Sequence, residues 1–432
     1  MGAHARRLGP WTATLLVVAS MIGTGVFTTT GFLVRDLGSN PAVMACWALG
    51  GVAALAGALC YAELGAALPQ NGGEYLLLSR IYHPAVGFTA GWISMIVGFS
   101  APIAAAAIAF SRYLAMLVPG LAEVPVSLAL IALLTAVHCL RVELSSGLQN
   151  LFTAGKAALI LAFVLGGLWL GTPGRALEAG STPMGEALLS ADFAVGLVFV
   201  SFAYQGWNAS LYIAGELRRP EKWLPLSLLL GTLAVTALYL GLNAVFLGAA
   251  PPAALAGRLE VGHIAAVALY GESAANVLSA VIALGLVSTV GAYVMTGPRV
   301  YEAMGQRFPG LALLTGRQEG RGPVRSILLQ GAVAAGMVLT SSFDALLTYA
   351  GFTLSAVAAL TVLGVFVLRW REPGLPRPCR TWGHPATPLL FVALMGWMMA
   401  QAIVSRPMVA LAGAATVLVG LGLWWGLERR HA

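Results

Sequence analysis

The sequence predicts an all-α polytopic membrane protein with twelve transmembrane helices. Its 432 residues are 59% hydrophobic and only 9% charged, whereas soluble domains carry about 25% charged residues. Apolar stretches that reach the roughly 20 residues needed to cross a bilayer recur along the whole chain. Basic residues are concentrated in alternate loops. The net charge of +7 is therefore a property of membrane-flanking loops, and we expect no nucleic acid partner.

The expected spans follow the apolar stretches between Gly, Pro and charge clusters. They are residues 11–36, 39–68, 84–118, 121–141, 147–172, 189–217, 224–250, 276–304, 323–341, 343–369, 385–404 and 407–427. Residues 1–10 and 428–432 form short terminal segments, and the loops are too short for a separate soluble domain. The first span is too long for the hydrophobic region of a signal peptide.

The basic residues test this arrangement, because cytoplasmic loops carry an excess of Lys and Arg. If the N-terminus is cytoplasmic, the outer segments and the span ends next to them hold only four basic residues: Arg35, Arg175, Arg258 and Arg406. Arg112 and Lys156 lie within spans and are assigned to neither side. The other 18 of the 24 lie inside. Both termini are therefore expected in the cytoplasm of a plasma membrane, most simply a bacterial inner membrane.

The first span has a glycine-rich interruption in its middle. Gly23 and Gly25 flank Thr24, and each Gly costs ~1 kcal/mol relative to Ala in a helix. A break here exposes the carbonyls of a half-helix ending near Ile22 and the amides of a half-helix beginning near Val26. Such groups suit an ammonium and a carboxylate, respectively. Close packing between helices is the alternative role of a Gly-x-Gly pair.

A second interruption lies in the sixth span, at residues 201–208. Spans one to five (11–172) and six to ten (189–369) then form two five-helix units, and residues 385–427 supply helices 11 and 12. An odd number of helices per unit inverts the second unit relative to the first. Matching interruptions in the first helix of each half are typical of inverted-repeat transporters. We therefore expect a five-plus-five inverted repeat with helices 1 and 6 discontinuous.

Lys156 is the most unusual charge, about 12 Å into the fifth span at 1.5 Å per residue. A charge at such depth costs ~2.5–3.5 kcal/mol on insertion scales and by default marks function. Its ammonium either snorkels to the cytoplasmic face or packs against the first break, where it replaces a sodium ion or couples transport to protons. Ser288 and Thr289 of the eighth span are candidates to face it or a cation. Ordinary hydroxyl bonds between helices are their alternative.

The sixth span carries further candidates. Phe202 and Tyr204 are the expected aromatic gate over a small ligand, with core packing as the alternative. If the helix unwinds, the carbonyls of Ser201, Phe202 and Gln205 complete an ammonium site. Asn208 is either a ligand contact or part of a hydrogen bond between helices.

Three carboxylates, Glu63, Glu74 and Glu216, lie at cytoplasmic helix ends near basic residues, and we expect ion pairs there. The sequence has no H-E-x-x-H, no G-x-S-x-G and no phosphate-binding loop, so we expect no enzyme activity. The four cysteines lack metal-ligand spacing and any disulfide framework. No metal and no cofactor are predicted.

Several motifs, in the right order, resemble the amino acid–polyamine–organocation (APC) superfamily. Residues 21–27 (MIGTGVF) resemble its first-helix motif, and residues 61–65 (YAELG) with 69–75 (PQNGGEY) resemble its second-helix exit and first inner loop. Residues 202–208 (FAYQGWN), with 215–217 (GEL) and Pro220, resemble the sixth-helix motif of the L-type amino acid transporter branch. Leu368-Arg369 with Arg377-Pro378 resembles the basic loop after helix ten.

This resemblance implies a LeuT-type fold and transport of amino acids by alternating access. Carried over by position, it implies that the substrate carboxylate binds the amides of Thr24, Gly25 and Val26. The α-amine then binds the carbonyls of Met21, Ile22 and Phe202. Further substrate-binding residues are Ser201, Ala203 and Gln205. Lys156 matches a fifth-helix lysine that occupies the place of a sodium ion in some members. The resemblance therefore implies transport without sodium.

Two departures from the family pattern matter. Gln205 stands where L-type relatives often have a small or acidic residue, which leaves the size of the side-chain pocket open. The outer loop around residues 119–125 lacks the cysteine with which heteromeric animal transporters tether a glycoprotein subunit. We expect no such disulfide-linked partner.

The sequence thus predicts a sodium-independent transporter, either an exchanger or a proton-coupled importer. Neutral amino acids are the expected substrates because no deep acidic residue awaits a cationic side chain. One alternative is an amine or polyamine permease of the same fold, which needs an acidic residue facing the pocket. The other is an amino acid sensor without net transport, although sensors commonly carry a large cytoplasmic tail.

Overall fold

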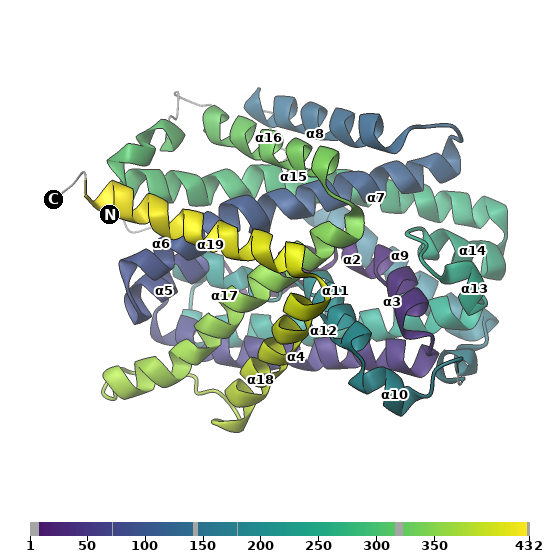
Figure 1. Ribbon diagram of the computed structural model, residues 1–432, viewed down its shortest axis with the longest axis horizontal. Helices are drawn as coiled ribbons and strands as arrows, with labels where there is room; N and C mark the ends of the chain where they lie inside the picture. The colour runs from purple at the N-terminus through teal and green to yellow at the C-terminus, as the bar shows by residue number, and fades with distance from the viewer. Residues whose placement is uncertain (1–7, 71, 141–145, 179, 316–322, 430–432) are drawn as a thin grey trace.

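Long helices run side by side through the molecule, and shorter ones cap its two ends (Figure 1). The computed structural model describes residues 8–70, 72–140, 146–178, 180–315 and 323–429. The rest of the expected terminal segments, together with Asn71, Arg141, Arg317 and Arg321 of the expected inner loops, lie outside the described residues. Within the described residues the one β-bridge joins Leu8 to Leu217.

In its described residues, the first part of the chain contains nine α-helices and a π-helical stretch. They are α1 (Pro10–Met21), α2 (Gly25–Thr28), α3 (Thr30–Leu37), α4 (Asn40–Ala67), α5 (Gly73–Ile81), α6 (Pro84–Ile93), η1 (Ser94–Ser100), α7 (Ala101–Leu117), α8 (Glu123–Cys139) and α9 (Ser146–Leu170).

The second part begins with short elements and continues with long helices. They are η2 (Pro173–Leu177), α10 (Met184–Leu189), α11 (Ala191–Ala203), η3 (Ala209–Glu216), α12 (Pro220–Ala249), α13 (Pro252–Leu255), α14 (Val261–Tyr270), α15 (Glu272–Arg307), η4 (Pro309–Thr315), α16 (Val324–Thr340), α17 (Phe343–Arg371), α18 (Ala386–Ser405) and α19 (Pro407–Glu428).

The all-helical membrane class is confirmed. Among the described residues, 8 helical segments are long and apolar enough to cross a bilayer. The other four expected spans correspond to α8, α9, α11 and α16, whose described apolar lengths are shorter. The short helices α5, α10, α13 and α14 occupy stretches that the sequence reading left as connections.

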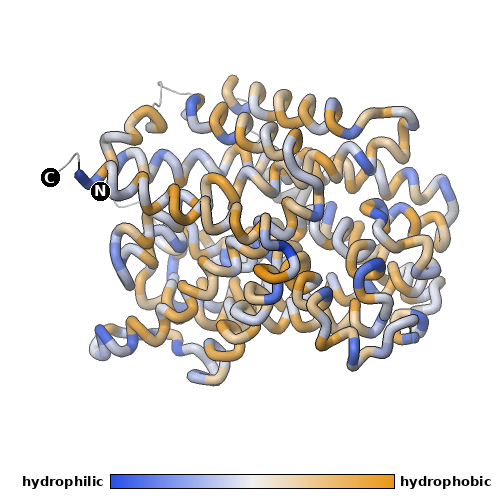
Figure 2. Tube along the Cα trace, viewed as in Figure 1, coloured by the Kyte–Doolittle hydropathy of each residue, from blue (hydrophilic) through white to orange (hydrophobic). Residues whose placement is uncertain are grey.

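Large apolar side chains cover the outside of the bundle. Leu161 and Trp169 of α9 are 49% and 88% exposed, and Leu284 of α15 is 67% exposed. Figure 2 shows hydrophobic residues along the helices, with most hydrophilic residues near helix ends and loops. An apolar surface of this extent is unfavourable in water and is satisfied by lipid chains.

The two chain ends lie at the same end of the bundle, and α5 lies there as well (Figure 1). The helices α13 and α14 lie at the opposite end. We call the end that holds the termini and α5 the terminal end.

A buried ion pair joins α4 to α17 at the terminal end. The Glu63 carboxylate, whose residue is 1% exposed, accepts hydrogen bonds from Arg369 Nε (2.8 Å) and Nη2 (2.7 Å) and from the Thr381 amide (2.7 Å). Arg377 Nε lies 3.6 Å away. The expected ion pair of Glu63 is confirmed, and it fastens the loop after α17 to α4. That of Glu216 stays a prediction.

The ion-pair prediction is wrong for Glu74. Among the described residues, its carboxylate accepts hydrogen bonds from neutral groups only, on Tyr61, Asn208 and Tyr212. The reason is the chain path. Gly72 and Gly73 adopt positive φ values of 130° and 56°, and this turn directs Glu74 into the bundle. The basic residue of the same helix, Arg80, faces outward and pairs with Glu372.

Replacing Arg369 with Ala is expected to destabilise the protein by up to about 3 kcal/mol, because the buried Glu63 carboxylate loses both of its guanidinium hydrogen bonds and keeps only the more distant Arg377 as a cationic partner. The measurement is the apparent melting temperature of purified protein in detergent. Arg80→Ala, which breaks the exposed pair with Glu372, is the matched control and should cost under about 1 kcal/mol. Equal shifts in the two variants would contradict the role of the buried pair.

Candidate functional site at two helix breaks

The first helix is broken where the sequence predicts. Helix α1 ends at Met21 and α2 begins at Gly25. Between them the Gly23 amide donates to the Met21 carbonyl (2.7 Å) in a tight turn. The amides of Thr24, Gly25 and Val26 have no hydrogen-bond acceptor among the described residues. A helix leaves its first amides unpaired, so this break presents donors without partners.

The sixth span is broken as well. Helix α11 ends at Ala203, and a 3-10 helix, η3, begins at Ala209. Gly206, between them, has a φ of 101°, a conformation that glycine adopts without strain. A Cβ at Gly206 would lie 2.6 Å from the carbonyl carbon of Ser20. The second break therefore packs directly on the end of α1.

The two breaks touch. The Gly25 backbone lies so close to Ala203 that an added Cβ would overlap the Ala203 Cα and Cβ. Tyr239 of α12 bridges both breaks, since its hydroxyl lies 2.5 Å from the Met21 carbonyl and 3.3 Å from the Ala203 carbonyl. A small molecule placed between the breaks would meet backbone groups from both.

Sequence reasoning missed Tyr239. The available signal was a phenol in the middle of a long apolar span. Buried tyrosine hydroxyls usually have a hydrogen-bond partner, and lipid offers none. That signal indicates that the Tyr239 hydroxyl needs a hydrogen-bond partner, but it does not identify the partner.

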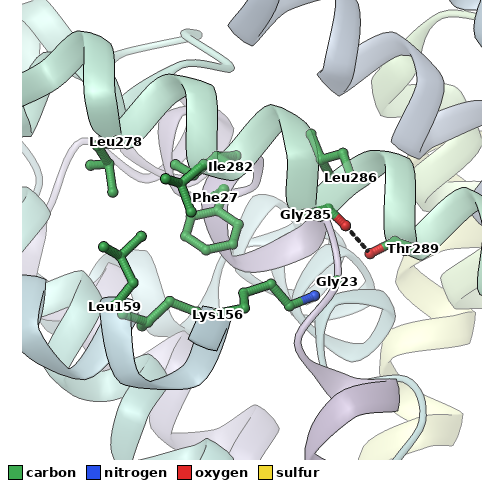
Figure 3. Close-up of a pocket in the computed structure, with 11 residues that line it drawn as sticks. Gly23, Phe27, Lys156, Leu159, Leu278, Ile282, Gly285, Leu286 and Thr289 are labelled. Carbon is green, nitrogen blue, oxygen red and sulfur yellow. Dashed lines mark hydrogen bonds between the residues drawn. The ribbon is translucent and has the colours of Figure 1, made fainter. Parts of the chain in front are cut away.

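Lys156 packs against the first break. Its Nζ donates to the Ile22 carbonyl (2.6 Å), and Figure 3 shows the side chain reaching from α9 toward Gly23. It lines a mainly apolar cavity together with Gly23, Phe27, Leu159, Ile160, Leu278, Val281, Ile282, Gly285, Leu286 and Thr289. Gly285 makes room for the lysine, because a Cβ there would lie 3.1 Å from Lys156 Cδ. The ammonium thus points inward to a backbone carbonyl rather than to the helix end.

The other polar candidates lie farther from this contact. Thr289 lines the cavity, and its hydroxyl donates to the Gly285 carbonyl of its own helix (2.9 Å), as Figure 3 shows. Ser288 is half-buried and is not among the lining residues. A role for these hydroxyls in coupling stays a prediction.

The structure places the sixth-span candidates Phe202 and Tyr204 in different surroundings. Phe202 is buried beside the break, and its carbonyl already accepts the Gln205 amide (3.0 Å). Tyr204 has the contacts of a core residue, because its hydroxyl donates to the Trp47 carbonyl (3.1 Å) and its ring packs on Tyr239. The gating roles of Phe202 and Tyr204 stay predictions, as do the substrate contacts of Ser201, Ala203 and Gln205.

A family model described as amino acid permease matches residues 8–424. The chain belongs to the amino acid permease family. The superfamily to which the motifs pointed is thereby confirmed.

Three relatives share just over a quarter of the residues of this permease. The serine/threonine exchanger SteT of Bacillus subtilis is 28% identical, over 99% of this chain and 98% of its own length. The human large neutral amino acids transporter small subunit 2 is 28% identical, over 98% of this chain and 81% of its own. The mouse Asc-type amino acid transporter 1 is 28% identical, over 98% and 82%. The similarity therefore spans both breaks and Lys156.

Replacing Gly25 with Val is expected to abolish stabilisation by amino acids, because the side chain would force the two breaks apart. Overpacking of this kind costs about 1–3 kcal/mol in stability. The measurement is the thermal shift of purified permease with and without a panel of amino acids. Gly336→Val is the control, since Gly336 has nothing within 4 Å of an added Cβ. Ligand-induced shifts preserved in the Gly25 variant would rule out this site.

Proposed function

We propose that this permease is a sodium-independent exchanger of neutral amino acids. The observation that carries the proposal is the Lys156 ammonium on the Ile22 carbonyl. It supplies a fixed positive charge to the carbonyl end of the first break, where a transporter that depends on sodium needs the ion. The names of relatives as exchangers and neutral amino acid transporters support the same function.

The proposed site lies between the two breaks. The free amides of Thr24, Gly25 and Val26 hold the substrate carboxylate. The α-amine binds carbonyl lone pairs at Met21, Ile22 and Phe202, since a carbonyl oxygen accepts two hydrogen bonds. Phe202 closes over the ligand, with Tyr204 behind it. Ser201, Ala203 and Gln205 border the side-chain pocket. The nearby Lys156 charge disfavours substrates with cationic side chains.

The proposed architecture has twelve spans in a five-plus-five inverted repeat, with α18 and α19 outside it. The breaks fall in the first span of each expected half, residues 11–172 and 189–369, which supports the repeat. A bound zwitterion bridges the two breaks and neutralises their exposed backbone groups. One helix bundle then rocks against the other, and the substrate reaches the opposite side.

In the proposed orientation the terminal end faces the cytoplasm, because 18 of 24 basic residues then lie on that side. The membrane is the plasma membrane. The loop between α7 and α8 contains no cysteine, so the proposed transporter works without a disulfide-linked glycoprotein subunit.

A proton-coupled importer on the same site is the second candidate, with Lys156 as a titrating group. An amine or polyamine permease is a third, and a sensor without net transport a fourth. The three relatives are named as an exchanger or as amino acid transporters, and these names favour none of the alternatives over exchange.

The deciding experiment is uptake of radiolabelled amino acids into sodium-free proteoliposomes. We expect uptake of small or large neutral amino acids only when the lumen is preloaded with the same substrate, because the site of an exchanger reorients across the membrane only with a substrate bound. Uptake into empty lumens driven by an inside-alkaline step would instead establish the proton-coupled importer. No amino acid uptake under either condition would overturn the proposal.

Replacing Lys156 with Ala is expected to lower exchange about tenfold. The loss leaves the Ile22 carbonyl unsatisfied at about 1–3 kcal/mol, and 1.4 kcal/mol is a factor of ten. Added sodium should partly restore the variant and leave the parent unchanged. Lys222→Ala, which removes a lysine stacked on the neighbouring Trp223 ring, is the control. Full sodium-free exchange in the Lys156 variant would contradict the assigned role.

A further inference from the structure

Glu74 is a buried carboxyl group surrounded by neutral donors. Its residue is 7% exposed. Tyr61 Oη lies 2.6 Å and Asn208 Nδ2 3.0 Å from its Oε1, and Tyr212 Oη lies 3.2 Å from its Oε2. The three donors come from α4, from the second break and from η3. The carboxyl group therefore connects α5 to the half of the sixth helix that follows its break.

The backbone conformation next to Glu74 allows its contact with Tyr212. Gly73, at a φ of 56°, lies against the ring of Tyr212, and an added Cβ would overlap that ring. On the other side, the ring of Tyr61 packs edge-on against Trp207 at 4.6 Å between centroids. Glu74 thus lies at the terminal end between side chains that are themselves held by packing.

No cation balances the carboxyl group among the described residues. The arginines of the neighbouring elements are engaged elsewhere: Arg80 with Glu372, Arg369 with Glu63, and Arg371 with the Ile81 carbonyl. His83, at the start of α6, accepts the Ala85 amide. The titratable groups that face Glu74 are the hydroxyls of Tyr61 and Tyr212, which donate to it while neutral. An ionised carboxylate buried without a cation costs several kcal/mol.

Burial raises the pKa of the Glu74 carboxyl group above its usual range, although the bonds from Tyr61, Tyr212 and Asn208 act in the opposite direction. When the terminal end opens, water reaches the group and its pKa returns toward the ordinary value. A group whose pKa is higher in the closed state favours that state at low pH. This preference is lost as the pH rises through the raised pKa.

We propose that Glu74 is a proton-binding latch, which carries a proton while the terminal end is closed and releases it to the cytoplasmic solution when that end opens. The protonated Oε2–H donates to Tyr212 Oη, whose own hydrogen turns away, and Oε1 keeps both of its donors. On opening, the O–H bond breaks and the proton passes to water. This role rests on the proposed alternating access and orientation, and it is separate from Lys156.

The test uses full-length permease in proteoliposomes, with the pH varied on the cytoplasmic side from about 5 to about 8. We expect exchange by the parent to rise across this range. Glu74→Gln keeps the shape and the Oε1 acceptor but cannot ionise. It should exchange at the parent's acid rate, within about threefold, at every pH.

Two further variants sharpen the result. Tyr212→Phe keeps the ring on Gly73 and removes a donor to the ionised carboxylate, so the midpoint of the pH profile should move to higher pH. Glu372→Gln removes an exposed carboxylate at the same end and should leave the profile unchanged. A Glu74→Gln variant with the parent's profile would overturn the proposal.

Infrared spectroscopy separates this proposal from the proposed function. A protonated Glu74 gives a carboxylic C=O stretch in the purified parent at neutral pH, and Glu74→Gln should lack that band. A band that persists in the variant overturns the proton site, whatever the transport assay shows. Suppose that Glu74→Gln lacks the band but the parent exchanges no amino acid. Proton binding by Glu74 would then be upheld, whereas the proposed function and the coupling of the latch to it would be overturned.

Discussion

A helix broken inside a bilayer leaves backbone groups without partners, and lipid supplies none. In this permease the Lys156 ammonium binds the Ile22 carbonyl, and the Tyr239 hydroxyl binds the Met21 carbonyl. These two side chains come from α9 and α12, so they also fasten the first break to its neighbours. The amides of Thr24, Gly25 and Val26 receive no such partner among the described residues. The break is therefore satisfied at its carbonyl end and open at its amide end. That asymmetry is what a ligand with a carboxylate can use.

Three glycines allow close contacts because they have no side chain. Gly25 allows α2 to touch Ala203, Gly206 allows the second break to touch Ser20, and Gly285 leaves space for Lys156. At Gly25 and Gly206 a methyl group has no room against the neighbouring chain, and at Gly285 it would press on the stem of the Lys156 side chain. Because the breaks are in contact rather than merely near each other, one small zwitterion can reach both. The same closeness limits the size of what fits, since packed interiors transmit strain instead of absorbing it.

Sequence patterns predicted the elements better than their partners. The apolar spans, the two breaks and the depth of Lys156 follow from local composition, because insertion in lipid and glycine's cost in a helix are local effects. The contact of Tyr239 with Met21 joins residues far apart in the chain and depends on how α12 packs. The environment of Glu74 was misread for a related reason. Nearby arginines suggested an ion pair, yet the turn at Gly72 and Gly73 directs the carboxylate inward while Arg80 faces out. The charges are visible in the sequence, but the directions in which they point are set by tertiary structure.

Lys156 and Glu74 are both buried and ionisable, but they are compensated in different ways, and this difference fits the different tasks proposed for them. Lys156 donates to a backbone carbonyl, an acceptor that cannot itself titrate. A fixed cation of that kind suits a transporter that dispenses with sodium. Within the part of the chain that the structure describes, Glu74 faces three hydrogen-bond donors and no cation, so its balance between ionised and protonated forms depends on whether water reaches it. It also lies at the terminal end, where α5 meets the sixth helix beyond its break, and not at the contact between the breaks. In the proposed mechanism, substrate recognition and pH sensitivity are therefore separated in space, so that a change in proton concentration would alter how readily the terminal end opens without altering the groups proposed to bind the amino acid.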